Sequence, residues 1–73
     1  MARYVVATRR DQRDSGDVAT ALDAIRGEPG IQVVGAADPH MVTIEASDED
    51  AGRLREKLAG THFVEAEIRR GLH

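Results

Sequence analysis

The hydrophobic and polar positions along the chain predict four short strands. Residues 41–46 and residues 63–68 alternate between apolar and polar side chains, with the period of two that is typical of a half-buried strand. A run rich in β-branched residues, Tyr4 to Thr8, predicts a strand near the N-terminus, and Ile31 to Val34 predicts another. The segment between the two middle strands, residues 37–40, contains Asp-Pro and predicts a turn.

A first helix is predicted after the N-terminal strand and a polar loop. Val18, Leu22 and Ile25 repeat at the spacing of one helix face. Ser15 or Asp17 can accept a hydrogen bond from a free amide at the start of this helix. A glycine after the last apolar position supplies a stop signal.

A second helix has clearer start and stop signals. Ser47 is the expected cap, and three acidic residues follow it in the positively polarised first turn. Ala51, Leu54 and Leu58 form an apolar stripe at helical spacing. Gly60 is expected to end the helix.

The order strand–helix–strand–strand–helix–strand predicts an α+β fold, the ferredoxin-like βαββαβ split βαβ sandwich. Right-handed crossovers place both helices on one face of a four-stranded antiparallel sheet. We expect a single domain over residues 1–73, with residues 68–73 as a flexible C-terminal tail because they show no periodicity.

The same alternation predicts which side chains lie on the open sheet face, away from the helices. If Val42, Ile44 and Val64 face the helices, the side chains on the opposite face include two large apolar groups and several carboxylates. These open-face residues are Met41, Thr43, Glu45, Phe63, Glu65 and Glu67. They are explained either as ordinary exposed strand positions or as an acidic surface that docks cationic side chains or helix N-termini. The exposed methionine and phenylalanine favour docking.

Composition narrows the classes of function. With 73 residues and no cysteine, the chain forms one domain without disulfides or thiolate metal sites. A net charge of −3 gives no general attraction to nucleic acid or to anionic membranes. No apolar stretch approaches the roughly 18 residues that cross a bilayer. The N-terminus has no signal-peptide pattern, so we expect a cytoplasmic protein, or a secreted one if a leader has been removed.

Groups that could carry catalysis or bind metal are scattered along the chain. We interpret His40, His62 and His73 as solvated turn and tail residues rather than metal ligands. The arginines after the first strand, beginning with Arg9, are interpreted as a solvated loop, because no aromatic RNA-binding motif accompanies them. Nothing encloses the carboxylates of an open sheet face, so we expect no catalysis, no cofactor and no metal.

Several segments resemble the propeptide family of subtilisin-type proteases, which includes free-standing proteinase inhibitors. Val64-Glu65-Ala66-Glu67, followed by six residues, is similar to the family's Val-Glu-(Glu/Pro)-Asp ending. Arg3-Tyr4-Val5-Val6 resembles its opening Lys/Arg-Tyr-Ile-Val strand. Residues 25–33 resemble its helix end, glycine turn and second strand, and residues 42–58 resemble its third strand and second helix. The resemblance thus covers nearly the whole chain.

This resemblance implies a non-catalytic domain that inhibits or chaperones a subtilisin-type serine protease. In the family, the open sheet face packs on surface helices of the protease, and acidic side chains near the end of the last strand cap those helices. Glu65 and Glu67 would take that role here. The tail would lie in the substrate cleft like a product, by pairing with the cleft edge. The tail residues concerned are Arg70, Gly71, Leu72 and His73.

A second interpretation remains open at the level of the sequence. The chain would then be a ferredoxin-like accessory module, which recruits a substrate to a separate enzyme or forms a homodimer through its bare sheet. This module would keep the fold and the exposed face, but the C-terminal tail would be dispensable.

Overall fold

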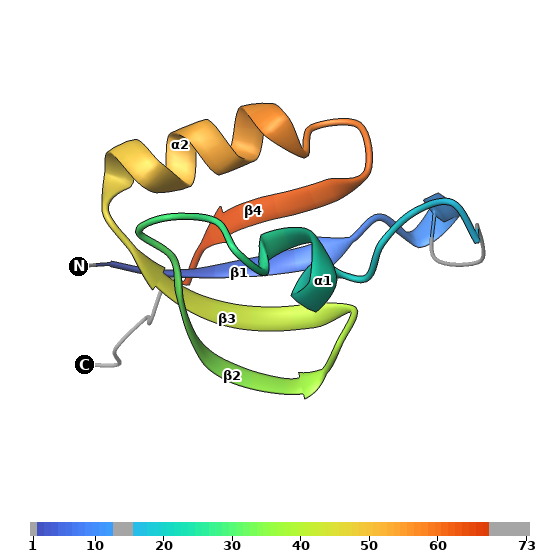
Figure 1. Ribbon diagram of the computed structural model, residues 1–73, viewed down its shortest axis with the longest axis horizontal. Helices are drawn as coiled ribbons and strands as arrows, with labels where there is room; N and C mark the ends of the chain where they lie inside the picture. Colours follow the sequence, from blue (N-terminus) through green and yellow to red (C-terminus); the bar gives the residue numbers. More distant parts are fainter. Residues whose placement is uncertain (1, 13–15, 68–73) are drawn as a thin grey trace, which may run out of the picture.

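The computed structural model describes residues 2–12 and 16–67 and confirms the predicted order of elements. The elements are β1 (Ala2–Thr8), the 3₁₀ turn η1 (Arg10–Gln12), α1 (Ala21–Ile25), β2 (Gln32–Asp38), β3 (Met41–Ala46), α2 (Asp48–Lys57) and β4 (His62–Ala66). The strands form one antiparallel four-stranded sheet in the order β2-β3-β1-β4, with both helices on one side (Figure 1). This α+β arrangement has the strand order of a ferredoxin-like fold.

The hydrophobic core lies between the sheet and the two helices. Alternate residues of β1 and β3 point into it, so Val6, Val42 and Ile44 are fully buried. The complete set of buried apolar residues is Tyr4, Val6, Ala21, Ile25, Val42, Ile44, Ala46, Ala51, Leu54, Leu58 and Val64. Nearly all of these side chains are aliphatic, because the chain has one tyrosine and one phenylalanine and the phenylalanine lies on the other face.

The predicted start of α2 is confirmed. The Ser47 hydroxyl accepts a hydrogen bond from the Asp50 N–H at 3.1 Å, which satisfies one of the free amides of the first turn. The helix ends at Lys57, with Leu58 as its C-terminal cap, and Gly60 lies in the turn that follows. Acidic residues in the first turn and basic residues in the last turn stabilise α2, because each charge is opposite in sign to the partial charge of the helix dipole at that end.

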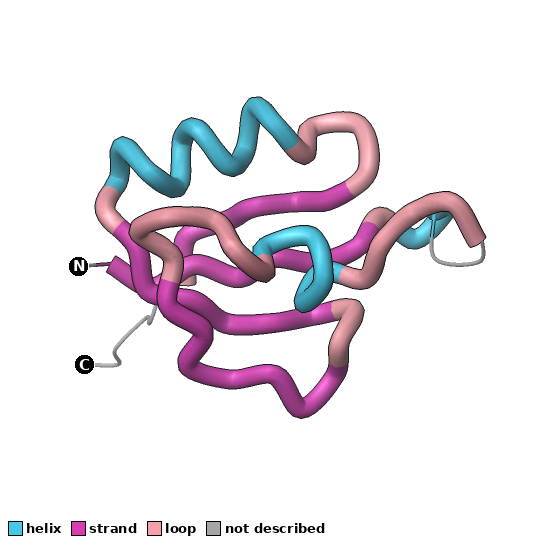
Figure 2. Tube along the Cα trace, in the orientation of Figure 1, coloured by secondary structure: helices cyan, strands magenta, loops and turns pink. Residues whose placement is uncertain are grey.

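The first helix is shorter than its periodicity predicts. α1 begins at Ala21, and its cap is Thr20, whose hydroxyl accepts a hydrogen bond of 3.2 Å from a backbone N–H one turn later. The assignment of the cap to Asp17 was wrong, and the alternative cap, Ser15, lies outside the described residues. Val18 therefore lies before the helix. The hydrogen bond from the Asp23 N–H to the Thr20 side chain fixes the start of α1, and the spacing of apolar residues does not show such a bond. Figure 2 shows how short α1 is beside α2.

Strand β2 is longer than predicted. It continues to Asp38, and the turn that was expected over residues 37–40 is reduced to Pro39 and His40. Pairing with β3 is antiparallel but irregular, with register shifts between Val33 and Asp38. Pairing with β3 therefore extends β2 over residues 35–38, which have a low intrinsic preference for strands. The strand preference of these residues alone does not predict this extension.

The last strand confirms the predicted alternation at Val64, which is buried, but not at Ala66. Ala66 was expected to face the helices, yet it is exposed because it ends an edge strand. β4 ends at Ala66 and Glu67 lies outside the strand, so the predicted continuation of the strand past Ala66 was wrong. The expected flexible tail, residues 68–73, lies outside the described residues. Among residues 2–12 and 16–67, no helix has the length and apolar character that crossing a membrane requires.

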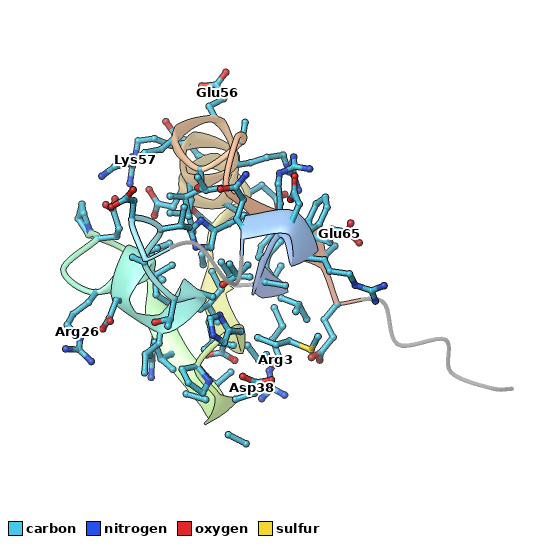
Figure 3. All side chains as sticks on the ribbon, turned by 90° about the vertical axis from the view of Figure 1, so that its right-hand side faces the viewer. Arg3, Arg26, Asp38, Glu56, Lys57 and Glu65 are labelled. Carbon is cyan, nitrogen blue, oxygen red and sulfur yellow. The ribbon has the colours of Figure 1, made fainter. Side chains whose placement is uncertain are left out.

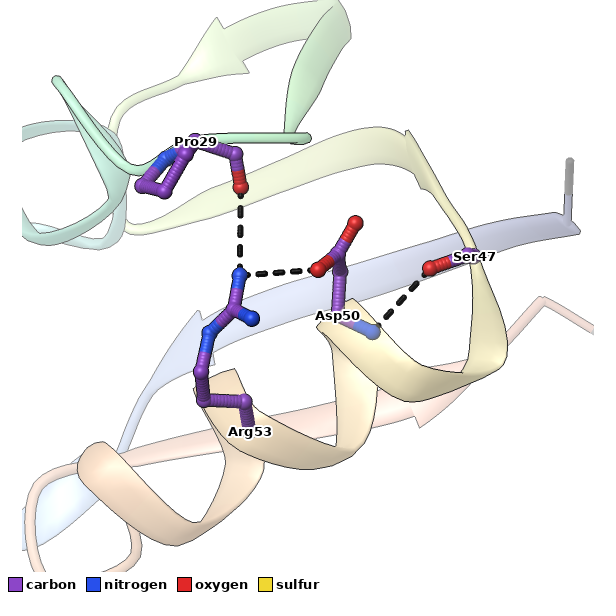
Figure 4. A network of polar contacts seen from close by, with 4 residues as sticks. All are labelled: Pro29, Ser47, Asp50 and Arg53. Atoms are coloured by element: carbon purple, nitrogen blue, oxygen red, sulfur yellow. Dashed lines mark hydrogen bonds and ion pairs between the residues drawn. The ribbon is translucent and has the colours of Figure 1, made fainter.

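Arg53 ties α2 to the loop that precedes β2 (Figure 4). Its Nη2 lies 2.8 Å from Asp50 Oδ1 and donates a hydrogen bond to the Pro29 carbonyl at 3.3 Å. Gly30 follows directly, and a Cβ atom at this position would collide with the Asp50 carboxylate. Position 30 therefore favours glycine in two ways, through its positive φ and because a side chain there would have to displace the Asp50 carboxylate.

Gly30→Ala should lower the free energy of unfolding more than Gly27→Ala. Both glycines have positive φ, 78° and 84°, where a side chain costs about 1–2 kcal/mol. Only at Gly30 does the added methyl group displace Asp50, which adds the loss of a partly exposed ion pair, about 0.2–1 kcal/mol. Urea unfolding measures both changes. In an Asp50→Ala background the two substitutions should cost the same, and an undiminished difference there would contradict the packing argument.

Tyr4 links β1 to the first turn of α2. Its hydroxyl donates a hydrogen bond to Asp48 Oδ1. This hydrogen bond, followed by burial and by the negative charge of Asp48, raises the pKa of Tyr4 above its ordinary value of 10.0, and the Arg55 charge opposes the shift. The folded protein therefore favours the neutral phenol.

The stability that this interaction contributes should be complete below about pH 10 and should be lost as pH rises through the folded pKa. Tyr4 is the only tyrosine, and tryptophan is absent, so the near-ultraviolet absorbance of tyrosinate reports this group alone. Asp48→Ala should lower the pKa of Tyr4 toward its ordinary value. Glu49→Ala, at the next and equally exposed position, is the control, and an equal effect of both substitutions would rule out the hydrogen bond as the cause.

Candidate functional site: the open sheet face

Neither helix covers the second face of the sheet. The odd-numbered residues of β1 point to this face, and the strand register places residues of β3 and β4 beside them. Val5 lies between Thr43 and Glu65. Figure 3 shows Arg3 and Glu65 on this side, whereas Arg26 and Lys57 project on the helix side.

A shallow depression lies near the middle of the open face. It has a volume of about 250 Å³ and is lined by Val5, Ala7, Met41, Phe63 and Glu65. The half-buried Val5 and Ala7 come from the central strand β1. Met41 and Phe63 on the flanking strands are 51% and 43% exposed, the two most exposed large apolar side chains among the described residues. The depression is therefore apolar, with a single carboxylate among its lining residues.

The sequence-predicted open-face residues of β3 and β4 all lie where the alternation places them. Met41, Phe63 and Glu65 are exposed, and Thr43 and Glu45 are half-buried. Two apolar groups and a carboxylate are thus brought together around the depression. Thr43 and Glu45 lie further along β3, on the same face but outside the depression's lining.

The carboxylates differ in their surroundings. Glu45 is 3.4 Å from Arg3 Nε on the neighbouring strand, so its charge is partly balanced. Glu65 lies at the rim of the depression and is exposed. Glu67 follows β4 directly, and its N–H donates a hydrogen bond of 2.9 Å to the Arg3 carbonyl. Glu65 and Glu67 therefore lie on the last described segment of the chain, next to the beginning of β1.

The tail residues Arg70, Gly71, Leu72 and His73, predicted to occupy a substrate cleft, lie outside the described residues. Their placement stays a prediction. The described chain ends at Glu67 beside Arg3, at the end of the sheet where β1 begins.

Arg9 has a role that the sequence did not indicate. Its guanidinium carbon lies 4.2 Å from the centroid of the Phe63 ring, and its Nε donates a hydrogen bond of 3.0 Å to the Ala59 carbonyl. Arg9 lies in the loop after β1, as expected, but it is half-buried and held by these contacts. The contact holds the ring of Phe63 beside the depression and joins β1, β4 and the turn after α2.

His62 is also not a solvated turn residue. It is 4% exposed at the start of β4, and its Nε2 lies 2.9 Å from the Ala19 carbonyl. Its Nδ1 lies 2.7 Å from the Thr61 hydroxyl, so both ring nitrogens have partners. The sequence contained a sign of this burial, because His62 is two residues before Val64 and a strand places both side chains on the same face of the sheet. A polar residue so close to Gly60 nevertheless resembles a turn residue in the sequence.

His40 has a hydrogen-bond partner as well. His40 is half-buried, and its Nδ1 lies 3.1 Å from the Thr8 hydroxyl, while His73 lies outside the described residues. Within residues 2–12 and 16–67, no group of three or more histidine or acidic side chains is placed to hold a metal ion. An apolar depression with an exposed aromatic ring and a carboxylate beside it has the composition that is typical of protein-binding surfaces.

Comparisons of the chain with protein-family models, with curated proteins and with solved structures find no match. They therefore leave the resemblance to subtilisin propeptides as an expectation. The fold itself rests on the structure, whose sheet order and helix placement are those of a ferredoxin-like α+β domain.

Arg9→Gln should lower the free energy of unfolding by about 1–2 kcal/mol, because it removes a cation–π contact and a charged hydrogen bond. Arg10→Gln makes the same change of charge at the next, exposed position and should stay within about 0.5 kcal/mol of the wild type. Urea unfolding of both variants provides the comparison. Equal stabilities for the two variants would show that the Arg9 contacts contribute nothing measurable.

Proposed function

We propose that the protein is a non-catalytic binding domain that inhibits or chaperones a subtilisin-type serine protease through its open sheet face. The observation that carries the proposal is the depression around Phe63 and Met41, which leaves these two large apolar side chains in water beside Val5 and Ala7. Burying such groups against a partner gains roughly 25 cal/mol for each Å² removed from water. The choice of a protease as partner rests on the sequence resemblance.

The carboxylates would give this surface its orientation on the partner. Helix N-termini carry unsatisfied amides and a partial positive charge, which favour anions. Glu65, exposed at the rim, and Glu67, directly after β4, would each approach one helix N-terminus on the protease. The apolar depression would supply most of the affinity, and the carboxylates would supply register and salt dependence.

The C-terminal tail would complete the contact. The residues Arg70 to His73 would enter the substrate cleft of the protease and pair with its edge as an added strand. This part of the proposal predicts that a chain ending at Arg69 loses inhibition, while its sheet face still binds.

The inhibition constant of the full chain against a subtilisin-type protease tests the proposal. Phe63→Ser should raise this constant by at least about fivefold, because truncating an aromatic anchor that the partner buries costs more than about 1 kcal/mol. Val34→Ser, at a site of similar exposure on β2 (39% against 43%), is the matched control and should leave the constant unchanged. Far-ultraviolet circular dichroism verifies that both variants fold.

A second pair of variants tests the charges. Glu65→Gln should weaken inhibition and reduce its dependence on salt, because it removes an exposed charge from the contact. Glu56→Gln makes the same change on α2, far from the open face (Figure 3), and should have no effect. If the full chain does not inhibit at all, the accessory-module interpretation takes the place of this proposal.

A further inference from the structure

Strand β2 is the least covered element of the sheet. It is the first strand in the sheet order, and all seven of its residues are exposed. Val33 is paired with Ile44, which is fully buried, yet Val33 itself is 42% exposed. The reason is that the five-residue α1 packs on β1 and β3 and is too short to cover the neighbouring strand as well.

β2 is also uncharged over most of its length. The segment Gln32–Ala37 contains no acidic or basic residue, in a chain of which 32% is charged. When two copies of one strand pair antiparallel around a two-fold axis, each residue faces a residue of the same segment, and like charges there would repel. An uncharged, apolar segment avoids this penalty, so β2 is chemically complementary to itself.

The opposite edge of the sheet is closed. On β4, the Val64 carbonyl accepts a hydrogen bond of 2.9 Å from Arg55 Nε. The His62 N–H donates to the Leu58 carbonyl at 2.8 Å. Part of the backbone row that a new strand would need is thus already bonded within the domain. Of the two edges of the described sheet, β2 is the one without such a cover.

From these observations we propose that β2 pairs antiparallel with β2 of a second copy of this chain and joins the two sheets edge to edge. Val34 lies at the centre of the contact, because the register shift leaves it without a partner residue on β3 and it is 39% exposed. The surface is separate from the depression around Phe63, so the proposal does not depend on the function proposed for the open face.

The dimer should be weak. The register of β2 on β3 is irregular, and irregularities such as β-bulges are one means by which proteins keep edge strands apart. A short strand pair also buries less than the roughly 1,200–2,000 Å² of a standard interface. Association should therefore rise with protein concentration instead of being complete at all concentrations.

Sedimentation velocity of the full chain over a wide range of concentrations is the test. The wild type should sediment faster as concentration rises. Val34→Lys should lower the association constant at least about tenfold, because two lysines then face each other across the pair. Met41→Lys places the same charge on the open face (51% exposed) and should leave association unchanged. If Val34→Lys does not fold, Val34→Glu replaces it, because it also places two like charges opposite each other.

A cross-linking experiment gives a second readout. The chain contains no cysteine, so Val34→Cys introduces the only thiol. Oxidation should join two copies, since facing residues of paired strands have Cβ atoms about 4.5–5.5 Å apart. Met41→Cys should cross-link far less.

Each outcome decides the proposal. A wild type that stays monomeric at every concentration overturns it and assigns the irregular register of β2 a protective role. Association that survives Val34→Lys but is lost in Met41→Lys also overturns it, and places the dimer contact on the open face instead. Loss of association in Val34→Lys with unchanged protease inhibition would establish the β2 contact independently of the function proposed for the open face.

Discussion

The packing of aliphatic side chains between one face of the sheet and the two helices is the interaction on which the rest of the structure depends. In this chain of 73 residues the two helices are only five and ten residues long, and they cover β1, β3 and part of β4. One face of the sheet and the strand β2 are left in water as a consequence. Both exposed surfaces, the depression around Phe63 and the edge of β2, follow from this one-sided burial.

The sequence predicted well those elements whose signals are local. β3 alternates without interruption, and the serine before α2 is followed by acidic residues, so element type and facing side chains were readable directly. The open-face residues Met41, Phe63 and Glu65 follow from the same period of two. The fold class follows from the order of the elements, because right-handed crossovers leave few ways to arrange them.

What the sequence could not show depends on contacts between distant segments. The end of β2 is determined by its hydrogen-bonded pairing with β3. The start of α1 is determined by the Thr20 side chain, and the sequence offers other residues nearby that could cap the helix equally well. The contact between Arg9 and Phe63 requires knowing that the residue after β1 meets the start of β4. His62 is buried because the Ala19 carbonyl and the Thr61 hydroxyl satisfy its ring nitrogens, and neither partner can be identified from spacing.

We propose the open sheet face as the contact surface for a subtilisin-type protease. The most direct measurement is a map of backbone amide chemical shifts of the full chain during titration with such a protease. If the claim is right, the largest changes fall on Val5, Met41, Phe63 and Glu65, with little change on the outer side of α2. Changes concentrated on α2, or no changes under conditions of saturation, would contradict it.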